Sequence, residues 1–318
     1  ALSSAASDVY KRQKKRFDRA QFNVEKFKTL SDIKHIPLLK KKELIFLQSI
    51  GPRLGGLLTK DIGELKRIFL SPGPIFDPED RMDDYWGYTE AFYSVGFRPG
   101  DVVQVTFNYH LSPAGLMFEE PLRNLGCASI PAGPTDPGTQ LDIMQKLRVS
   151  GYVGTASYLM HLAQKAEEKG INLRKDLFQE VAFVTGERLS EKMRSQMKKK
   201  YDLIMRQGYG TADVGCIGYE CFHKTGLHIA NRCYVEICHP DTGIPLKDGE
   251  VGEIVVTAFN KTYPLIRLAT GDLSYIDRSP CACGRTSPRL GSIVGRVDTT
   301  ARIKGMFVYP HQVEQVMA

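Results

Sequence analysis

The feature that most constrains the fold is a regular alternation of strand-like and helix-like segments between residues 101 and 201. Apolar runs predict strands at 101–109, 127–132, 151–157 and 180–186. Patterns of helical period predict helices at 116–126, 141–149, 158–170 and 189–201. Strands that alternate with helices of this length predict an α/β fold, in which helices cover a mostly parallel sheet.

After residue 209 the pattern changes to short β-rich segments separated by turn sequences, among them "CYVEICHP", "GEIVVTAF" and "LSYIDRS". We interpret about 216–294 as a smaller, β-rich, antiparallel subdomain. Residues 295–318 predict a strand, a turn and the start of a helix, which we interpret as the beginning of a further domain.

The composition is that of an ordinary globular protein, with 42% apolar and 25% charged residues in a chain of 318. The net charge of +7 comes partly from short basic runs at 11–16 and 198–200. There is no extended basic and aromatic stripe, so we expect no nucleic-acid partner. We also see no apolar segment long enough to cross a bilayer and no apolar signal-peptide core, so we expect a cytoplasmic protein without a membrane partner.

Residues 1–16 are interpreted as a non-native or disordered leader. They contain "DVYKRQ", which is typical of the translated end of a sequencing-library transposon. We therefore leave them out of the fold argument.

Six of the seven cysteines lie between residues 216 and 283. Cysteine in a cytoplasmic chain is more typical of buried thiols or metal ligands than of disulfides. Two short pairs, in "ECFHKTGLH" and "CACGR", predict a tetrahedral structural zinc site made of Cys221, His228, Cys281 and Cys283. Two alternatives stay open: His223 could replace His228, and "CAC" could belong to an ordinary β-rich core.

Four segments with Gly and Asp follow predicted strands, where ligands bind in open α/β sheets. They are "VTGERLS" at 184–190, "QGYGTADVG" at 207–215, "RLATGD" at 267–272 and "GRVD" at 295–298. Small residues allow a nucleotide to approach the backbone, and acidic groups such as Asp213 and Asp272 can hold a magnesium ion or the hydroxyls of a ribose.

A different segment, "IFLSPGPIFDPED" at 68–80, has one Ser, one Gly and three prolines. A phosphate cradle needs several converging backbone N–H groups, and a proline has none. Local chemistry therefore predicts a rigid turn between a strand-like run and a helix-like stretch.

The order of these motifs resembles that of the phenylacetate-coenzyme A ligase branch of the adenylate-forming (acyl-CoA synthetase) superfamily. The resemblance runs from about Phe17 to Ala318 and rests on "YGTADVG" followed by "YEC", on "GLH", "GEVGEIVVT", "PLIRLATGD" and "CACGR", and on "GRVDTTARIKGMFVYPHQVEQV". It implies a large AMP-binding domain at 17–294 that includes the β-rich, metal-bearing subdomain, and a hinge with the start of a truncated C-terminal α+β lid domain at 295–318.

The resemblance also implies roles for individual residues. Thr211 would lie beside the α-phosphate and Asp213 would bind magnesium, which makes these two the expected catalytic residues. Asp272 would bind the ribose hydroxyls and Asp298 would be the hinge. The full set of implied nucleotide-binding residues is Ser71, Gly73, Gly186, Glu187, Arg188, Tyr209, Gly210, Thr211, Asp272 and Arg296.

By the same resemblance, Tyr109, Pro113 and Tyr158 would line an acyl pocket for an aryl or hydrophobic carboxylic acid. The implied reaction uses ATP to form an acyl-adenylate and pyrophosphate, and coenzyme A then displaces AMP to give a thioester. Mg²⁺ and a structural Zn²⁺ at the Cys/His set would be the metal ions, and we allow for a homodimer.

The sequence departs from the family pattern where phosphate and magnesium would bind. The family's loop S-S-G-T-T-G-K-P corresponds to the segment at 68–80, in which Ser71 and Gly73 remain while the threonines and the lysine are absent. Ala212 replaces a Thr, and Asp213 stands where Glu is usual. Two hypotheses follow: an acid:CoA ligase in which other side chains make up for the loop, or a divergent nucleotide- or acyl-binding protein that does not adenylate.

Overall fold

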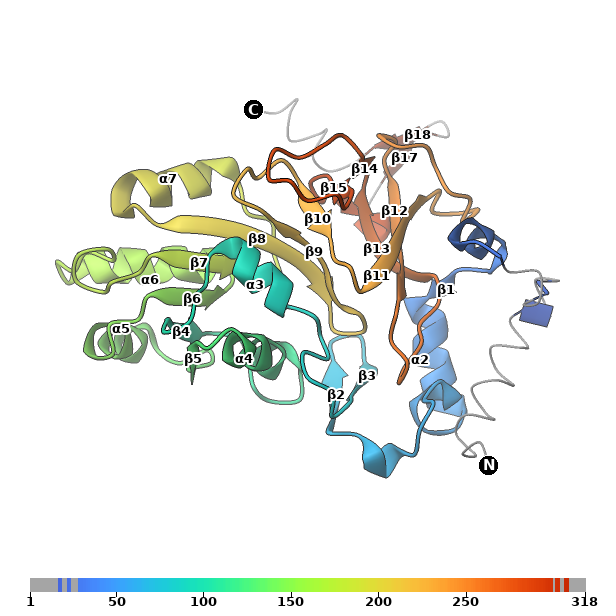
Figure 1. The fold of residues 1–318 in the computed structure, drawn as a ribbon, viewed down its shortest axis with the longest axis horizontal. Helices are drawn as coiled ribbons and strands as arrows, with labels where there is room; N and C mark the ends of the chain where they lie inside the picture. Colours follow the sequence, from blue (N-terminus) through green and yellow to red (C-terminus); the bar gives the residue numbers. More distant parts are fainter. Residues whose placement is uncertain (1–16, 19–21, 24–27, 300, 304–305, 309–318) are drawn as a thin grey trace.

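The structure is a computed structural model that describes residues 17–18, 22–23, 28–299, 301–303 and 306–308 (Figure 1). The leader expected at 1–16 and the helix expected at the end of the chain lie outside these residues.

The described residues form a nine-stranded sheet, a five-stranded sheet and two two-stranded sheets (Figure 1). The parallel half of the large sheet consists, in spatial order, of β5 (Ala128–Pro131), β4 (Val102–Val105), β6 (Gly151–Gly154), β7 (Val181–Val184) and β8 (Ile204–Thr211). The sheet continues with antiparallel pairing through β9 (Gly215–Glu220), β10 (Leu227–Ile229), β15 (Arg289–Leu290) and β14 (Ile276–Asp277). The predicted α/β class with a mostly parallel sheet is confirmed.

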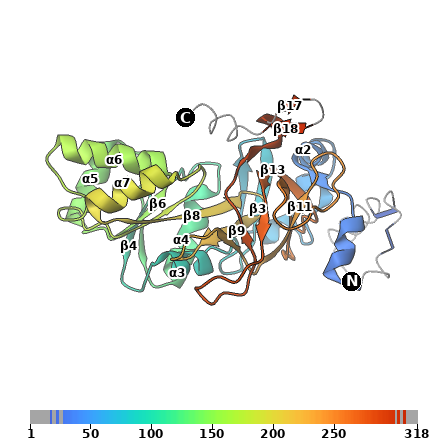
Figure 2. The same ribbon diagram turned by 90° about the horizontal axis from the view of Figure 1, so that it is seen from above.

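Helices cover both faces of the parallel half (Figure 2). On one face lie α5 (Pro137–Lys146), α6 (Ala156–Glu168) and α7 (Glu191–Tyr201), and on the other lie α3 (Thr89–Val95) and α4 (Ala114–Asn124). Strand β7 shows why: Ala182 and Val184 belong to the core under α5, α6 and α7, whereas Phe183 between them packs on Phe92 of α3 and Phe118 of α4. Side chains alternate across a strand, so an apolar run of this kind is buried on both faces.

Helix α5 begins earlier than the sequence predicts. The sequence predicts a helix at 141–149, but the helix begins at Pro137. The carboxylate of Asp136 caps it by accepting hydrogen bonds from the N–H groups of Gly138 at 2.8 Å and Thr139 at 3.3 Å. Proline is well suited to the first helical position, because its missing N–H would have no partner there.

The smaller sheet has the order β1 (Leu39–Lys40), β13 (Leu268–Ser274), β12 (Gly252–Ala258) and β11 (Cys233–Cys238), and β16 (Gly295–Arg296) also pairs with β13. The strands of the β-rich stretch at 216–294 are therefore shared between two sheets, since β9, β10, β14 and β15 extend the larger one. Helix α2 (Lys41–Ile50) follows β1 directly.

The segment at 68–80 is a β-hairpin, not a strand followed by a helix. Strands β2 (Arg67–Ser71) and β3 (Ile75–Glu79) pair antiparallel, with Leu70 opposite Phe76 and Ser71 opposite Ile75. The helix-like interpretation of the second half was wrong, because Pro78 and the cross-strand apolar pairs favour the extended conformation. The predicted rigid turn is present at residues 72–74.

The remaining elements are short. They are β17 (Ala301–Ile303), β18 (Met306–Val308), and the 3-10 helices η2 (Leu30–His35), η3 (Arg53–Gly56), η4 (Ile62–Glu64) and η5 (Val297–Thr299). Among the described residues, every helix is too short or too polar to cross a bilayer.

Candidate functional site

A cavity of about 450 Å³ opens at the carboxyl ends of β7 and β8. Seven of the sequence-predicted residues line it: Gly186, Glu187, Arg188, Tyr209, Gly210, Asp272 and Arg296. All four of the Gly- and Asp-containing segments contribute residues to the cavity, and two residues just before the fourth segment also line it. Ligands bind at this edge of open α/β sheets, so the cavity is the candidate nucleotide cleft.

Asp272 is held by two partners in the cleft. The hydroxyl of Tyr209 donates to Oδ2 at 2.8 Å, and Nη1 of Arg296 donates to Oδ1 at 2.8 Å. Burial and the Asp272 charge raise the pKa of Tyr209 well above its ordinary value, so the phenol keeps its proton and remains a donor. Arg296 also bonds to Asp298 at 3.1 Å, which places the expected hinge residue next to the cleft.

Glu187 links the loop after β7 to helix α6. Its carboxylate accepts hydrogen bonds from the backbone N–H and, at 2.9 Å, the hydroxyl of Ser157. The backbone carbonyl of Glu187 accepts from Nε2 of Gln207 at 3.4 Å. This wall of the cleft is therefore held by neighbouring elements.

The sequence analysis did not name six residues that also line the cleft: Thr185, Gln207, Gly208, Ile293, Val294 and Gly295. Gln207 and Gly208 belong to the motif "QGYGTADVG". The predicted position of this motif at a strand end was a sufficient signal to find both residues. A Cβ on Gly208 would collide with the ring of Phe183, which explains the glycine at that position. Ile293 and Val294 had no local signal.

The expected phosphate side lies outside the cleft lining. Ser71 and Gly73 are in the β2–β3 hairpin, and the Ser71 hydroxyl donates to the carbonyl of Ile75 at 3.3 Å. Thr211 ends β8, and its hydroxyl accepts from the N–H of Val214 at 3.3 Å in the turn that holds Asp213. The hydroxyls of Ser71 and Thr211 thus each form a hydrogen bond within their own turn.

Two charged residues that the sequence analysis did not single out join Asp213. Nζ of Lys41, the first residue of α2, lies 2.8 Å from Oδ2 of Asp213. Asp77 of β3 is 1% exposed. Burial, followed by the charge of Asp213, raises the pKa of Asp77 to about 8, against the smaller opposite effects of Ser71 and Lys41. The acidic residues of "IFDPED" were the available signal for Asp77.

The residues expected around an acyl group lie at the ends of β4 and β6. The ring of Tyr109 packs so closely on Gly115 that a Cβ there would lie 2.7 Å from it, and burial raises the pKa of Tyr109 above its ordinary value. The hydroxyl of Tyr158 donates to the carbonyl of Thr135 at 2.7 Å, and Pro113 is the N-cap of α4. Their role as an acyl pocket stays a prediction.

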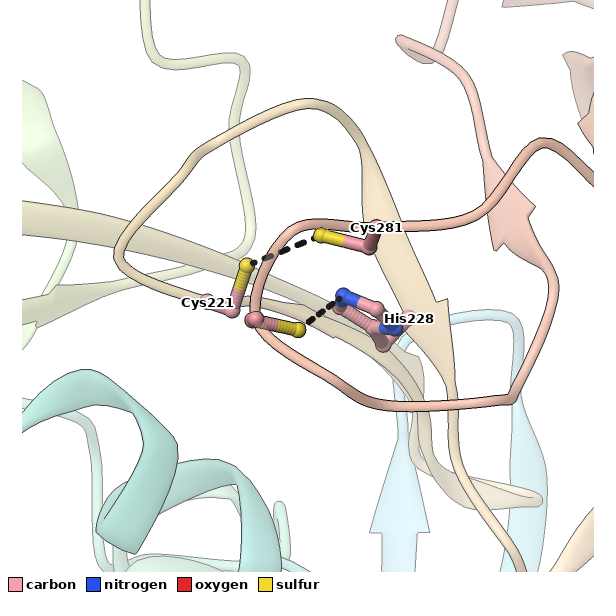
Figure 3. Close-up of side chains that lie close together, drawn as sticks. Cys221, His228 and Cys281 are labelled. Carbon is pink, nitrogen blue, oxygen red and sulfur yellow. Dashed lines mark hydrogen bonds between the residues drawn. The ribbon is translucent and has the colours of Figure 1, made fainter.

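A Cys/His cluster lies between the β9–β10 loop and the loop before β15 (Figure 3). One ligand atom from each of Cys221, His228, Cys281 and Cys283 falls within 4.8 Å of the others. The sulfurs of Cys221 and Cys281 are 3.7 Å apart, and Nε2 of His228 lies 3.4 Å from the sulfur of Cys283. Among the described residues the cluster contains His228 and not His223, which is exposed.

The cluster has the dimensions of a zinc site. Zinc bonds of about 2.3 Å to sulfur and about 2.05 Å to nitrogen give tetrahedral edges of about 3.8 Å between two sulfurs and about 3.6 Å between sulfur and nitrogen. Nδ1 of His228 lies 3.2 Å from the hydroxyl of Ser287, the type of second contact that orients a ligating imidazole. Burial alone would raise the pKa of Cys281, but the Cys283 N–H and hydrogen bonds from Thr225, Cys283 and His228 lower it to about 5. The donor set therefore fits a structural zinc ion.

Glu220 connects the cluster to the cleft. It directly precedes Cys221, and its Oε2 accepts a hydrogen bond from the backbone N–H of the cleft residue Gln207 at 2.7 Å. The guanidinium of Arg194 holds both oxygens, with Nη2 at 2.7 Å from Oε1 and Nη1 at 2.9 Å from Oε2. The pair is buried on both sides.

Comparisons with known proteins point to one enzyme family. The chain is 30% identical over 336 residues to phenylacetate-coenzyme A ligase of Thermus thermophilus, a match that covers 99% of this chain and 73% of the relative. It is 26% identical over 320 residues to phenylacetate-coenzyme A ligase of Escherichia coli, with 95% and 70% covered. No protein-family profile matches the chain.

Among solved structures, the chain resembles an open conformation of 2-hydroxyisobutyryl-CoA ligase in complex with 2-HIB-AMP and CoA. The TM-score is 0.89 at 23% identity, and the match covers 99% of this chain and 78% of the other. The likeness shows that the fold is the same.

Proposed function

The chain belongs to the phenylacetate-coenzyme A ligase family of adenylate-forming enzymes, and from that premise we propose that it is an ATP-dependent acid:CoA ligase. The observation that carries the proposal is the cleft at the ends of β7 and β8, with Asp272 held between Tyr209 and Arg296. A buried phenol and a guanidinium that already bind this carboxylate keep it in place to accept hydrogen bonds from a ribose.

The proposed roles follow the geometry of the cleft. Gly186, Glu187 and Arg188 would border the adenine, and the fixed carbonyl of Glu187 gives this wall its position. A Cβ at Gly210 would collide with the Tyr88 hydroxyl and the Gly215 carbonyl, so a glycine is required at this crowded strand end. We place the α-phosphate beyond it, next to Thr211.

The acid would bind beside the cleft, towards β4 and β6. A Cβ on Gly186 would lie 3.7 Å from the ring of Phe107. The centroids of the Phe107 and Phe118 rings are 5.2 Å apart. These aromatic rings support an aryl or hydrophobic carboxylate as the substrate, and Tyr109 packs against the same core as Phe107.

We also propose a structural zinc ion at Cys221, His228, Cys281 and Cys283, and Mg²⁺ at Asp213. Zinc would join the β9–β10 loop to the loop before β15 and would take no part in the reaction. Magnesium, when bound, would neutralise charge on the transferred phosphate. The adenylation step needs neutralisation of this kind more than it needs a base.

A second candidate is a nucleotide- or acyl-binding protein on the same fold that does not form adenylates. The observation that favours it is Asp77, a buried carboxylate in the hairpin that corresponds to the phosphate loop. Unless it is protonated or bound to a cation, this carboxylate would repel the β- and γ-phosphates of ATP.

Pyrophosphate release separates the two candidates. The full chain is offered ATP, Mg²⁺ and a panel of aryl and aliphatic acids, and AMP binding is measured by calorimetry in parallel. The ligase predicts release with at least one acid. AMP binding without release from any acid would refute the ligase and support the second candidate. Asp83→Asn is a matched control, because the Asp83 side chain is 85% exposed.

A further inference from the structure

Three charged side chains from three different elements meet beside the hairpin. Asp77 comes from β3, Asp213 from the turn between β8 and β9, and Lys41 from the start of α2. Nζ of Lys41 lies 2.8 Å from Oδ2 of Asp213, and Gln48 of the same helix accepts a hydrogen bond at 2.8 Å from the N–H of Phe76, the neighbour of Asp77. Both charges also act electrostatically on Asp77, so the three groups form one cluster. We call it the Asp77 cluster.

Asp77 lacks a partner that its charge would require. It is 1% exposed, and within the described part of the chain neither of its carboxylate oxygens has a hydrogen bond of normal geometry. The nearby Ser71 hydroxyl donates to the carbonyl of Ile75 instead. A buried carboxylate without a donor or a counter-ion is strongly disfavoured, so this group points to a missing cation or proton.

Lys41 forms a direct ion pair with only one of the two carboxylates. Its Nζ lies 2.8 Å from Oδ2 of Asp213, whose side chain is 2% exposed. The Lys41 side chain is itself 33% exposed, so it has solvent into which its ammonium can withdraw. Lysine is a flexible, compact charge that can hold a cation position and leave it.

We propose that Asp77 and Asp213 together bind one divalent cation of the Mg²⁺ or Mn²⁺ type, and that Lys41 occupies the cation position when the metal is absent. Magnesium is bound in proteins through one or two carboxylates, with water and substrate phosphates completing its octahedral shell. Asp77 adds the second carboxylate. The proposal rests on the proposed function for Asp213 as a metal ligand, and the role of Asp77 is new.

The charge balance explains how a carboxylate can replace a phosphate-binding cation. Two carboxylates and one ammonium alone leave this side of the site with a net negative charge. A divalent cation that takes the place of the Lys41 ammonium balances the two carboxylates, and its remaining coordination positions can face a phosphate. The hairpin then contributes to phosphate binding through a metal ion, although Pro72 and Pro74 provide no N–H groups.

The test is Mn²⁺ binding to the nucleotide-free protein, with its Cys/His cluster loaded with zinc beforehand. Free Mn²⁺ is counted by electron paramagnetic resonance, and binding is also followed by the fluorescence of Trp86, the single tryptophan of the chain. Trp86 lies 6.4 Å from Phe69 of the hairpin, and its carbonyl accepts from the N–H of Cys216 in β9 at 2.8 Å. It therefore reports on both sides of the Asp77 cluster.

We expect one saturable Mn²⁺ site in the wild type and at least tenfold weaker binding in Asp77→Asn. Asparagine has the shape of the protonated acid, so this variant folds. Lys41→Met removes the competing ammonium and is expected to bind Mn²⁺ more tightly than the wild type. Asp83→Asn, with an exposed carboxylate, is expected to bind like the wild type.

Equal Mn²⁺ affinity in Asp77→Asn and wild type, or no saturable site in the wild type at millimolar Mn²⁺, would overturn the proposal. In that case Asp77 is simply a buried protonated acid. The outcome is separate from that of the proposed function, because no nucleotide is present. If Mn²⁺ binding depends on Asp77 but no acid gives pyrophosphate release, only the ligase proposal is refuted. If pyrophosphate is released but Asp77→Asn binds Mn²⁺ as well as the wild type, only this inference is refuted.

Discussion

Replacing Cys283 by serine should remove zinc from the protein and lower its free energy of unfolding. The four donors come from two segments that are far apart in the sequence, and Cys221 and Cys281 are separated by 60 positions. A metal ion that joins them closes the loop between them in the folded protein, and its binding free energy adds to the free energy of unfolding. Three remaining donors cannot complete the tetrahedron of a structural zinc site.

The size of the effect follows from the length of that loop. Closing a loop of this length lowers the conformational entropy of the unfolded chain by an amount worth about 4 kcal/mol at room temperature. We therefore expect Cys283→Ser to lower the free energy of unfolding by roughly 4 kcal/mol, and a strong zinc chelator to do the same to the wild type. Chelator added to the variant should cause little further loss, because both treatments remove one interaction.

The assay combines zinc analysis with denaturant unfolding. The wild type should contain about one zinc ion per chain and Cys283→Ser much less than one. Cys127→Ser is the matched control, because Cys127 is a buried thiol outside the cluster and its sulfur bonds to the carbonyl of Arg98. A wild-type protein that is free of zinc and fully folded, or a Cys283→Ser variant that keeps its zinc, would refute the assignment.

Two further predictions concern the cleft and the hairpin. Asp272→Asn should weaken AMP binding about tenfold, since it removes the charge that Tyr209 and Arg296 hold in place, and calorimetry would measure it. An unchanged affinity would argue against a ribose contact. Asp80 should stabilise the protein at neutral pH: burial tends to raise its pKa, but Lys60, Thr262 and the Arg81 N–H together hold that pKa below 3.8. This stabilisation is present above pH 3.8 and is lost as the pH falls through the lowered pKa, so Asp80→Asn should cost about 1–3 kcal/mol at pH 7 and little near pH 2 in denaturant unfolding. Equal losses at both pH values would contradict this.

The parallel half of the large sheet could be predicted because its signals are local. Residues such as Ala182, Phe183 and Val184 are apolar in succession, which is the pattern of a strand buried on both faces. In the helices between the strands, apolar residues recur with the period of a helix, so these helices could also be predicted. The second half of the hairpin could not be predicted in this way, because its strand character depends on the pairing of Phe76 with Leu70.

The cleft was predictable where a motif lies at a strand end, and unpredictable where contacts are distant in the sequence. Asp272 was found from "RLATGD", but Arg267 in the same motif has a structural role: it is buried, pairs with Glu236 and donates to the backbone carbonyl of Ile36. Lys41 and Asp213 are 172 positions apart in the sequence, and no local pattern predicts their contact. The choice of His228 over His223 likewise depends on which side chain the β9–β10 turn directs inward.

The carboxylate of Glu220 has a consequence for how this protein would respond to metal starvation. The carboxylate binds the N–H of Gln207 in the cleft wall, and the next residue, Cys221, is part of the Cys/His cluster. The cleft wall and the cluster therefore share a direct connection through the end of β9. If zinc and nucleotide bind as proposed, zinc content and nucleotide affinity would be thermodynamically linked, and a preparation with a partly filled cluster should contain two populations with different dissociation constants.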